Sequence, residues 1–505
     1  MCIKMKGLLF NNSKPIEPSL PSRMDIALFV GFVSRRSNSA VPEPISKWLI
    51  ANCFNNSDEL LNVPVPIENW DIFDQLFSWD NRTVVENEID DELKIDTYLG
   101  AAVHSFFQQG GKKCYVVRAG DNIKFGSSKA ERNDLLQQIV PGYFGSPSAY
   151  ADDRLSWFGI AYLYGLPDVA ILSIPDLPEL VAAEAEELST EIPEKEVPPE
   201  QFVECSGSDV DSEQDDASKY LLSPRCSSAD YTNWIALIHH IAVMLENPKS
   251  GRATQLLASV PLPQEGTDAH NDMNAFLAAN ISGSVFVQLV YPWVKMPAHK
   301  LPEDLNVPEG VVAGLLARNA ILRGSFRTIC QLPLFAVDDV FPQLSNKQRY
   351  SINEDYDLSD RVSLFDMTIN GVRLISDVTS SKNIDYRQAN VARIVSMLVR
   401  ESRRIGEAMV FESSGEQLWR NIIDRLTVFL TYLYRAGALN GANAVEAFHV
   451  RCDRSTMTQN DIDNGRVIVQ VLFSAATSIE SIIVTLTMDH AGQNVGIAPQ
   501  ITEVA

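Results

Sequence analysis

The stretch from Gly415 to Val471 constrains the fold most, because it combines a long amphipathic helix with strands in one fixed order. Gly437 and Gly441 end the helix. The apolar residues of the helix recur at helical spacing on one side, which predicts packing against a core. They are Leu418, Ile422, Leu426, Phe429, Leu430 and Leu433.

The residues after this helix alternate in the manner of β-strands. Strands are predicted at 448–452 and 466–473, with a polar connection at 456–464 between them. A third strand is predicted at 479–488. A helix followed by such strands predicts a mixed α/β domain in this part of the chain.

Four pieces of this stretch, in this order, resemble the C-terminal domain of contractile tail sheath proteins, which occur in contractile phages and phage-tail-like injection systems. That family has a helix opening with Leu-Trp, a Gly-Ala-Leu-x-Gly turn, a Glu-Ala-Phe-x-Val-Arg-Cys-Asp strand and an Ile-Asp-x-Gly-Arg lead into a Val-rich strand. The matching pieces here are 418–419, 437–441, 446–453 and 462–466. Each piece alone is common in α/β domains, so the ordered set carries the resemblance.

Two further stretches resemble the same family. Residues 99–120 hold an Ala-Val-x-x-Phe-Phe helix, a Gly-Gly turn and a Cys-x-Val-Val-Arg strand. Residues 291–324 hold a Tyr-Pro-Trp strand end and a Pro-x-Gly-x-x-Ala-Gly-x-x-Ala-Arg helix. The chain departs from the family at 329–332, in place of an Ala-Pro-Ala-Asn segment, and at 370–376, in place of a Gly-Arg-Gly-Ile strand. These departures indicate a divergent paralogue.

The chain has 505 residues and a formal net charge of −23, with 45% hydrophobic and 21% charged residues. This length predicts two to four structural domains. The negative charge argues against nucleic acid or an anionic membrane as a direct partner, and no apolar run is long enough to span a bilayer. The seven cysteines form no C-x-x-C pair, so we expect a reduced protein that assembles in the cytoplasm.

The sequence contains no motif of a known catalytic or cofactor site, so we predict no catalytic residue, no cofactor and no metal ion. Residues 110–112 read Gly-Gly-Lys but lack the spacing of a phosphate-binding loop, and they lie between a helix and a strand in the wrong order. His239 and His240 are adjacent on a predicted helix. They therefore point about 100° apart and cannot chelate one ion together.

The order of the chain predicts a core built from both of its ends. The apolar run from Met24 to Val33 predicts a strand buried on both faces. The resemblance implies an α/β tail-sheath core formed by the N- and C-terminal parts, with inserted middle domains and extended terminal arms. The expected divisions are an arm at 1–22, the N-terminal part of the core at 23–120, an inserted outer domain at 121–283, the C-terminal core domain at 284–478, and a C-terminal strand and tail arm at 479–505.

The segment 179–219 holds about fourteen acidic residues against two lysines. Such a composition cannot bury enough apolar surface to offset its ordering entropy, so it predicts a solvated, partly disordered surface insertion. An acidic metal site is the alternative, but the spacing fits no EF-hand. Elsewhere we predict strand structure at 160–174 and a short strand at 409–411.

The resemblance implies a structural sheath subunit, which polymerises as stacked hexameric rings around an inner tube and contracts to drive the tube into a target. The implied partners are copies of this chain or paralogous sheath subunits, the inner tube protein, and a baseplate or cap protein. The particle is then a phage tail or a phage-tail-like device, released or anchored. Two alternatives stay open: a specialised ring near the baseplate or cap, and an unrecognised α/β enzyme.

The resemblance also implies two sets of contact residues. The C-terminal domain of the family holds the tube, so the exposed cations of the predicted helix are tube-interface candidates, namely Arg420, Arg425 and Arg435. The terminal arms of the family add strands to the sheets of neighbours. The arm candidates here are the apolar residues Ile3, Leu8, Leu9, Phe10, Ile479, Ile482, Ile483, Val484 and Leu486.

Overall fold

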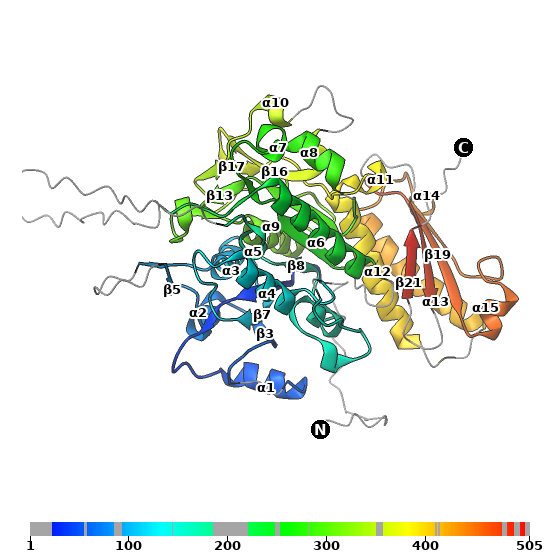
Figure 1. Cartoon of the computed structure of the whole chain (residues 1–505). Coiled ribbons are helices and arrows are strands. Elements are labelled where there is room, and N and C mark those ends of the chain that lie inside the picture. The colour runs from blue at the N-terminus through cyan, green and yellow to red at the C-terminus, as the bar shows by residue number, and fades with distance from the viewer. Residues whose placement is uncertain are drawn as a thin grey trace, which may run out of the picture.

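Figure 1 shows the computed structural model of the chain. It describes residues 23–54, 58–84, 93–143, 145–184, 221–247, 253–281, 283–349, 357–409, 412, 415–476, 482–488 and 495–499.

A large sheet forms the centre of the molecule (Figure 1). It has eight strands in the order β17-β16-β12-β10-β8-β1-β7-β3. The six inner strands are parallel, and each edge strand runs antiparallel to its neighbour. Parallel strands covered on both faces need continuous apolar runs, and every residue of β1 is buried. The bounds are β1 Ala27–Phe32, β3 Pro64–Ile67, β7 Cys114–Gly120, β8 Ile171–Ser173, β10 Gln255–Ser259, β12 Val287–Tyr291, β16 Val362–Thr368 and β17 Gly371–Leu374.

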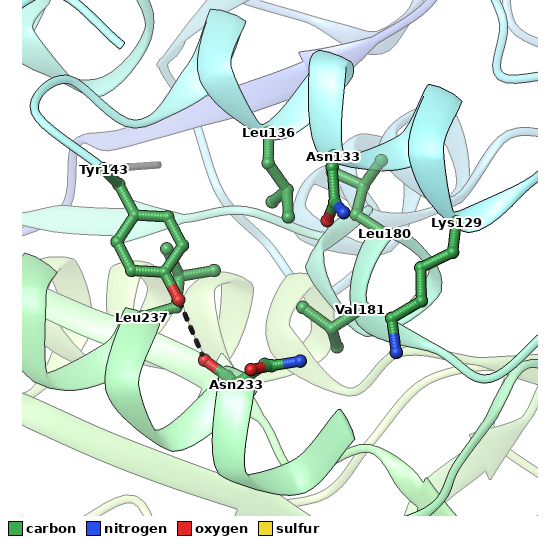
Figure 2. A pocket seen from close by; sticks show the side chains of 8 residues that line it. All are labelled: Lys129, Asn133, Leu136, Tyr143, Leu180, Val181, Asn233 and Leu237. Atoms are coloured by element: carbon green, nitrogen blue, oxygen red, sulfur yellow. Dashed lines mark hydrogen bonds between the residues drawn. The ribbon is translucent and has the colours of Figure 1, made fainter. Parts of the chain in front are cut away.

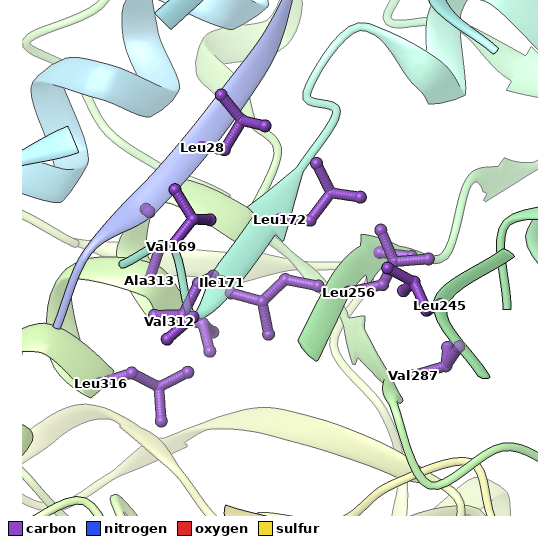
Figure 3. Packing of buried hydrophobic residues seen from close by; sticks show 14 of the residues in the cluster. Leu28, Val169, Ile171, Leu172, Leu245, Leu256, Val287, Val312, Ala313 and Leu316 are labelled. Carbon is purple, nitrogen blue, oxygen red and sulfur yellow. The ribbon is translucent and has the colours of Figure 1, made fainter. Parts of the chain in front are cut away.

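Helices cover both faces of this sheet. Successive side chains on a strand point to opposite faces, so Ile171 and Leu172 of β8 mark the two sides. Figure 3 shows Ile171 beside Val312 of α9 (Glu309–Leu322), which packs on β8 and β10. Leu256 of β10 is in register with Leu172, and Figure 3 places it beside Leu245 of α6 (Ser228–Glu246). The sheet is therefore the middle layer of a three-layer core.

Local capping signals fix the starts of these helices. Thr97 accepts the Gly100 N–H at the start of α3, and Ser–acid capping boxes begin α4 and α6. The remaining helices of the core are α1 Glu43–Ala51, α2 Trp70–Leu76, α3 Tyr98–Gln108, α4 Lys129–Ile139, α5 Leu177–Val181, α7 Asp268–Asn271, α8 Met273–Asn280, α10 Asn346–Arg349 and α11 Ile384–Arg387.

Short strands and 3-10 turns connect these elements. A three-stranded sheet has the order β14-β13-β15. The bounds are β2 Ser34–Arg35, β4 Phe77–Ser78, β5 Arg82–Thr83, β6 Lys94–Ile95, β9 Arg225–Cys226, β11 Leu262–Pro263, β13 Trp293–Lys295, β14 Leu305–Asn306 and β15 Asp339–Phe341, with 3-10 turns η1 Arg154–Ser156, η2 Gly159–Gly165, η4 Pro302–Asp304 and η5 Leu358–Asp360.

The prediction that both ends of the chain build one core is confirmed. Helix α3 packs along α9. His104 Nδ1 lies 2.7 Å from His299 Nε2, so a side chain from the first part of the chain bonds directly to one from the second. The fold is mixed α/β, as predicted.

The predicted inserted outer domain at 121–283 is wrong in part. Strands β8 and β10 come from this range, yet they lie in the middle of the central sheet, between β1 and β12. All five residues of β10 are buried. The range therefore contributes the centre of the core as well as peripheral elements.

The predicted acidic surface segment at 179–219 is also wrong at its beginning. Glu179 lies in α5, is buried, and forms a bidentate ion pair with the buried guanidinium of Arg82. A buried carboxylate needs such a partner, because an unpaired charge is costly away from water. Residues 185–219 of the segment lie outside the described residues.

The C-terminal domain consists of two long helices and a four-stranded antiparallel sheet in the order β18-β19-β20-β21 (Figure 1). The predicted helix and the strands predicted at 448–452 and 466–473 are confirmed, and the strand predicted at 479–488 is confirmed over 482–488, since residues 479–481 lie outside the described residues. Met409, predicted to begin a short strand, is instead the last residue of α12. The bounds are α12 Ala389–Met409, α13 Glu416–Arg435, α14 Ala444–Ala447, β18 Phe448–Arg451, α15 Gln459–Asp463, β19 Val467–Phe473, β20 Ile482–Met488 and β21 Val495–Pro499.

Helix α12 connects the core to this domain. The guanidinium of Arg393 near its start forms two hydrogen bonds with the buried Asp377 carboxylate, at 3.1 and 2.6 Å. Further along, α12 packs against α13 and β20. One continuous helix thus carries packing from the core into the C-terminal domain.

Candidate functional site

Figure 2 shows a small pocket between α4, α5 and α6. The Tyr143 hydroxyl donates to the Asn233 carbonyl at 3.3 Å across it. Its volume of about 10 Å³ is room for about one water molecule, so it does not hold a substrate or a nucleotide. The lining residues are Lys129, Asn133, Leu136, Tyr143, Leu180, Val181, Asn233 and Leu237.

In the part of the chain that the structure describes, no group of three His, Cys, Asp or Glu side chains is placed to hold a metal ion. The helices described there include none that is long and apolar enough to cross a membrane.

In open α/β sheets, ligands bind at the carboxyl ends of the parallel strands. Here the Asp176 carboxylate occupies that position after β8. It accepts the Phe32 N–H at the end of β1, at 2.7 Å, and the Leu99 N–H in the first turn of α3, at 3.1 Å. Burial raises the pKa of Asp176 to about 7. The Asp176 side chain thus occupies the place at the start of α3 where an anionic ligand could otherwise bind.

A second carboxylate, that of Glu309 at the start of α9, fills the neighbouring position. It accepts the Ser173 hydroxyl at 2.6 Å and the Ile174 N–H at 3.0 Å, both at the end of β8. It also accepts the Ser259 N–H of β10 at 2.8 Å. Burial raises the pKa of Glu309. These bonds join α9 to two strands, so the edge that binds ligands in α/β enzymes is used here for structure.

Asp176 and Glu309 were not predicted from the sequence as important residues. Both follow a proline, in Pro-Asp and Pro-Glu, but the local sequence does not indicate which groups donate hydrogen bonds to them. Asp176 bonds to a residue 144 positions away. Only the assembled sheet brings these groups together.

The candidate site that remains is the surface of the C-terminal domain. The helix α13 buries the predicted apolar side, including Leu418, Leu426 and Leu433. The predicted tube-interface residues Arg420, Arg425 and Arg435 are all exposed.

The three arginines do not share one stripe of α13. Arg425 and Arg435 lie on one face with Val428 and Tyr432, at spacings of three and four residues, whereas Arg420 lies about 140° around the helix from Arg425. Val428 is 71% exposed and Tyr432 is 50% exposed. We define the outer face of α13 as Arg425, Val428, Tyr432 and Arg435. Its two apolar members, Val428 and Tyr432, were not predicted as contact residues, although both fall outside the buried apolar stripe of the helix.

Arg420 has an exposed partner of its own. Its guanidinium lies 3.5 Å from the Glu416 carboxylate one turn earlier, and both side chains are 73% exposed. Exposed pairs of this kind contribute only ~0.3–0.5 kcal/mol. Arg420 therefore remains available to a partner at little cost.

The predicted arm residues fall into two groups. Ile3, Leu8, Leu9, Phe10 and Ile479 lie outside the described residues. Ile482, Ile483, Val484 and Leu486 lie in β20, which pairs along its length with β19 of the same chain. In the single chain this strand is therefore the third strand of the chain's own sheet.

The β3 edge of the central sheet and the β18 edge of the C-terminal sheet differ in their capacity to pair with a further strand. The β3 edge of the central sheet contains Pro64 and Pro66, which lack the N–H that a strand partner needs. The β18 edge, Phe448–Arg451, contains no proline, and no strand among the described residues pairs with its outer side. The C-terminal sheet therefore has an edge that can accept a strand.

Comparisons with known proteins come from structure alone. No family model matches the sequence, and no curated protein matches it. The helical sheath of the anti-feeding prophage (AFP) in its contracted state has a TM-score of 0.54 and 20% identity, covering 95% of this chain and 98% of that one. A chain of the AFP baseplate in its contracted state has a TM-score of 0.58 and 15% identity, covering 94% and 95%.

A sheath complex from a second system gives the same result. The contracted PVC sheath of an extracellular contractile injection system has a TM-score of 0.52 and 14% identity, covering 100% of this chain and 99% of that one. These matches run over nearly the whole length of both chains and bear out the fold that the sequence resemblance implied. The chain has the contractile tail sheath fold.

Proposed function

We propose that this chain is a structural sheath subunit of a contractile injection apparatus, which polymerises in stacked rings around an inner tube and drives the tube outward on contraction. The observation that carries the proposal is the likeness to AFP and PVC sheaths over 95–100% of each chain. A shared fold alone leaves function open. The carboxylates that fill the carboxyl edge of the core sheet favour a structural role over the enzyme alternative.

A contracting sheath needs subunits that keep their shape while their mutual contacts change. The core of this chain suits that demand. Asp176 joins β1, β8 and α3, Glu309 joins α9 to β8 and β10, and the Arg393–Asp377 pair fixes α12. The free energy released on contraction then lies in contacts between subunits rather than in refolding.

The subunits are linked by strand addition at the C-terminal sheet. The supporting observation is that the β18 edge is open and free of proline, while the β3 edge is blocked. Residues 3–18 of a neighbouring copy supply the added strand, and main-chain hydrogen bonds provide the linkage. The strand Ile482–Met488 takes part by exchanging between copies from its position beside β19.

The inner tube is held by the outer face of α13 together with Arg420. Two arginines flank two exposed apolar side chains on this face, which complements an acidic surface with an apolar centre. Each exposed ion pair contributes only ~0–1 kcal/mol. Many such contacts around a ring hold the tube, yet release it together when the subunits move.

A specialised ring next to the baseplate is the second candidate. The observation that favours it is the match to chains in two AFP baseplate structures, at TM-scores of 0.54 and 0.58. Counting copies per particle separates the candidates, because a main sheath subunit recurs in every ring and a specialised subunit occurs in one ring.

Negative-stain electron microscopy of the purified full chain at increasing concentration tests the proposal. A sheath subunit is expected to form rings with six-fold symmetry or hollow tubes. A chain that stays monomeric across the concentration series, and also when co-expressed with its tube protein, contradicts the proposal.

A further inference from the structure

A second exposed surface, far from α13 in the sequence, combines apolar and basic side chains. We define the Arg318 surface as Arg318, Ile321, Leu322, Arg323, Arg327 and Phe335. Leu322 is 74% exposed, Phe335 is 49% exposed and Ile321 is 47% exposed. Exposed apolar groups gathered in this way mark interaction sites more often than isolated ones do.

The surface is held in place by specific contacts. The Arg318 guanidinium lies 4.8 Å from the centre of the Phe335 ring and donates to the Pro333 carbonyl at 2.5 Å. The buried Gln109 side chain donates to the Phe335 carbonyl at 2.7 Å and accepts its N–H at 3.1 Å. Phe335 is therefore presented to solvent by a fixed backbone.

The charge of this surface is opposite to that of the chain, whose formal net charge is −23. In the described part of the structure, Arg318 and Arg327 bond to carbonyl oxygens and lie over aromatic rings, and neither of them is within ion-pair distance of a carboxylate. Arg323 is also exposed, and its carbonyl accepts an N–H of the Arg327 guanidinium at 3.0 Å. The arginines therefore keep their capacity to bind an acidic partner.

An acidic partner is present in the same chain. Residues 185–220 contain twelve Asp and Glu residues and two lysines. They also contain apolar residues among the acids, including Leu188, Ile192 and Phe202. This composition complements both the arginines and the exposed apolar side chains of the Arg318 surface.

The ends of this segment lie within reach of the surface. The Ala183 N–H donates to the Arg225 carbonyl at 2.9 Å, so the chain leaves and returns at one point. The Arg225 guanidinium lies 5.4 Å from the Phe341 ring centre, and Phe335 is six residues before Phe341, ~20 Å away at most. A flexible chain of half this length has an r.m.s. span of ~24 Å.

From charge, composition and reach together, we propose that residues 185–220 dock on the Arg318 surface of their own chain. The docking covers Leu322 and Phe335 in the isolated subunit and is weakened by salt, because its ion pairs are exposed. The surface lies outside α13 and the C-terminal sheet, so this proposal does not depend on the sheath function.

Photo-crosslinking of the full-length chain tests the docking. A p-benzoylphenylalanine residue replaces Leu322, whose exposure makes the change compatible with folding, and the dilute monomer is irradiated and mapped by mass spectrometry. We expect crosslinks to residues 185–220 within a single chain. We expect at least a five-fold loss of this product in 1 M NaCl, and the same loss in the Arg323→Glu, Arg327→Glu double variant.

Two controls make the result decisive. The same crosslinker in place of Val428, which is similarly exposed on α13, is expected to give no product with 185–220. Unchanged thermal unfolding of the double variant shows that it is folded. Crosslinks only to other residues, crosslinks only between two chains, or a product that is insensitive to salt would each overturn the proposal.

Discussion

The Asp176 carboxylate accepts the backbone N–H of Phe32 at 2.7 Å and so joins the end of β8 to the end of β1. The bond is possible because the residue before Phe32 is Gly31. A Cβ atom on Gly31 would lie 2.2 Å from Asp176 Oδ2, closer than any real contact. The absence of one methyl group therefore gives this carboxylate its place in the core.

The first prediction concerns Gly31. Gly31→Ala forces the Asp176 carboxylate away from its two N–H donors, so we expect a loss of ~1–3 kcal/mol in the free energy of unfolding. Urea titration measures it. Gly415→Ala is the matched control, because nothing lies within 4 Å of a Cβ there. Equal effects of the two substitutions would refute this account of Gly31.

The second prediction is a pH dependence caused by Asp176. Its pKa is about 7 in the folded protein and ~3.9 in an unfolded chain, so the folded state binds more protons between these values. The stability that Asp176 contributes is therefore present at low pH and is lost as pH rises through about 7. The slope is at most ~1.4 kcal/mol per pH unit.

Asp176→Asn removes this titrating group and keeps the shape of the side chain. Urea unfolding at pH 5, 6, 7 and 8 should show a smaller loss of stability with rising pH in the variant than in the natural chain. The Arg82–Glu179 ion pair and the raised pKa of Glu309 also affect this region, so the difference between the two chains is the informative quantity. Identical slopes would show that Asp176 is ionised throughout.

The third prediction concerns the buried pair of Arg393 and Asp377. Asp377→Ala leaves an uncompensated guanidinium in the core, which costs ~3–5 kcal/mol. Glu43→Ala breaks the exposed pair with Lys47 and should cost less than ~0.5 kcal/mol. Chemical denaturation measures both, and similar costs at the two sites would mean that the Arg393–Asp377 pair does not fix α12.

The fourth prediction tests the arm. Deletion of residues 1–20 removes none of the described residues, the first of which is Arg23. We expect a folded monomer, with unchanged circular dichroism, that no longer polymerises in sedimentation assays. Replacing residues 1–20 by a Gly/Ser sequence of equal length should have the same effect. Normal polymerisation of either variant would remove the arm from the account.

The fifth prediction tests the contact with the tube. Reversal of Arg420, Arg425 and Arg435 to glutamate should leave the subunit folded but loosen it from the tube, giving empty or contracted sheaths in electron micrographs. The control reverses Lys47, Lys124 and Lys347, which are exposed and lie outside the C-terminal domain. Tube-filled, extended particles from the arginine variant would contradict the assignment of α13.

Long periodic elements were predictable from the sequence because their signal is local. The helix α13 and the strand β1 each carry the apolar pattern that their packing needs. The predicted strand at 160–174 was wrong over its first half, where η2 forms instead. Gly159 has a φ of 49° there and approaches the Ile139 carbonyl too closely for any side chain, so contacts with α4 override the local preference.

The order of strands in the central sheet was not predictable in the same way. β8 has three residues, and it is separated from its partner β10 by the acidic segment and α6. The periodicity of apolar residues carries no information about which distant strands pair. The prediction of a separate inserted domain at 121–283 was therefore wrong in part. The arginines of α13 were predictable as exposed cations. Val428 and Tyr432 could be recognised as exposed apolar residues only once the buried face of the helix was known.

Cryo-electron microscopy of particles assembled from this chain and its tube protein, before and after contraction, would show whether the chain forms a contracting sheath. The account predicts stacked six-fold rings of this chain around a tube, which become wider and shorter while the core of each subunit keeps its coordinates, including the Asp176–Phe32 bond. A structure in which the chain encloses no tube, or in which its core refolds on contraction, would contradict the account.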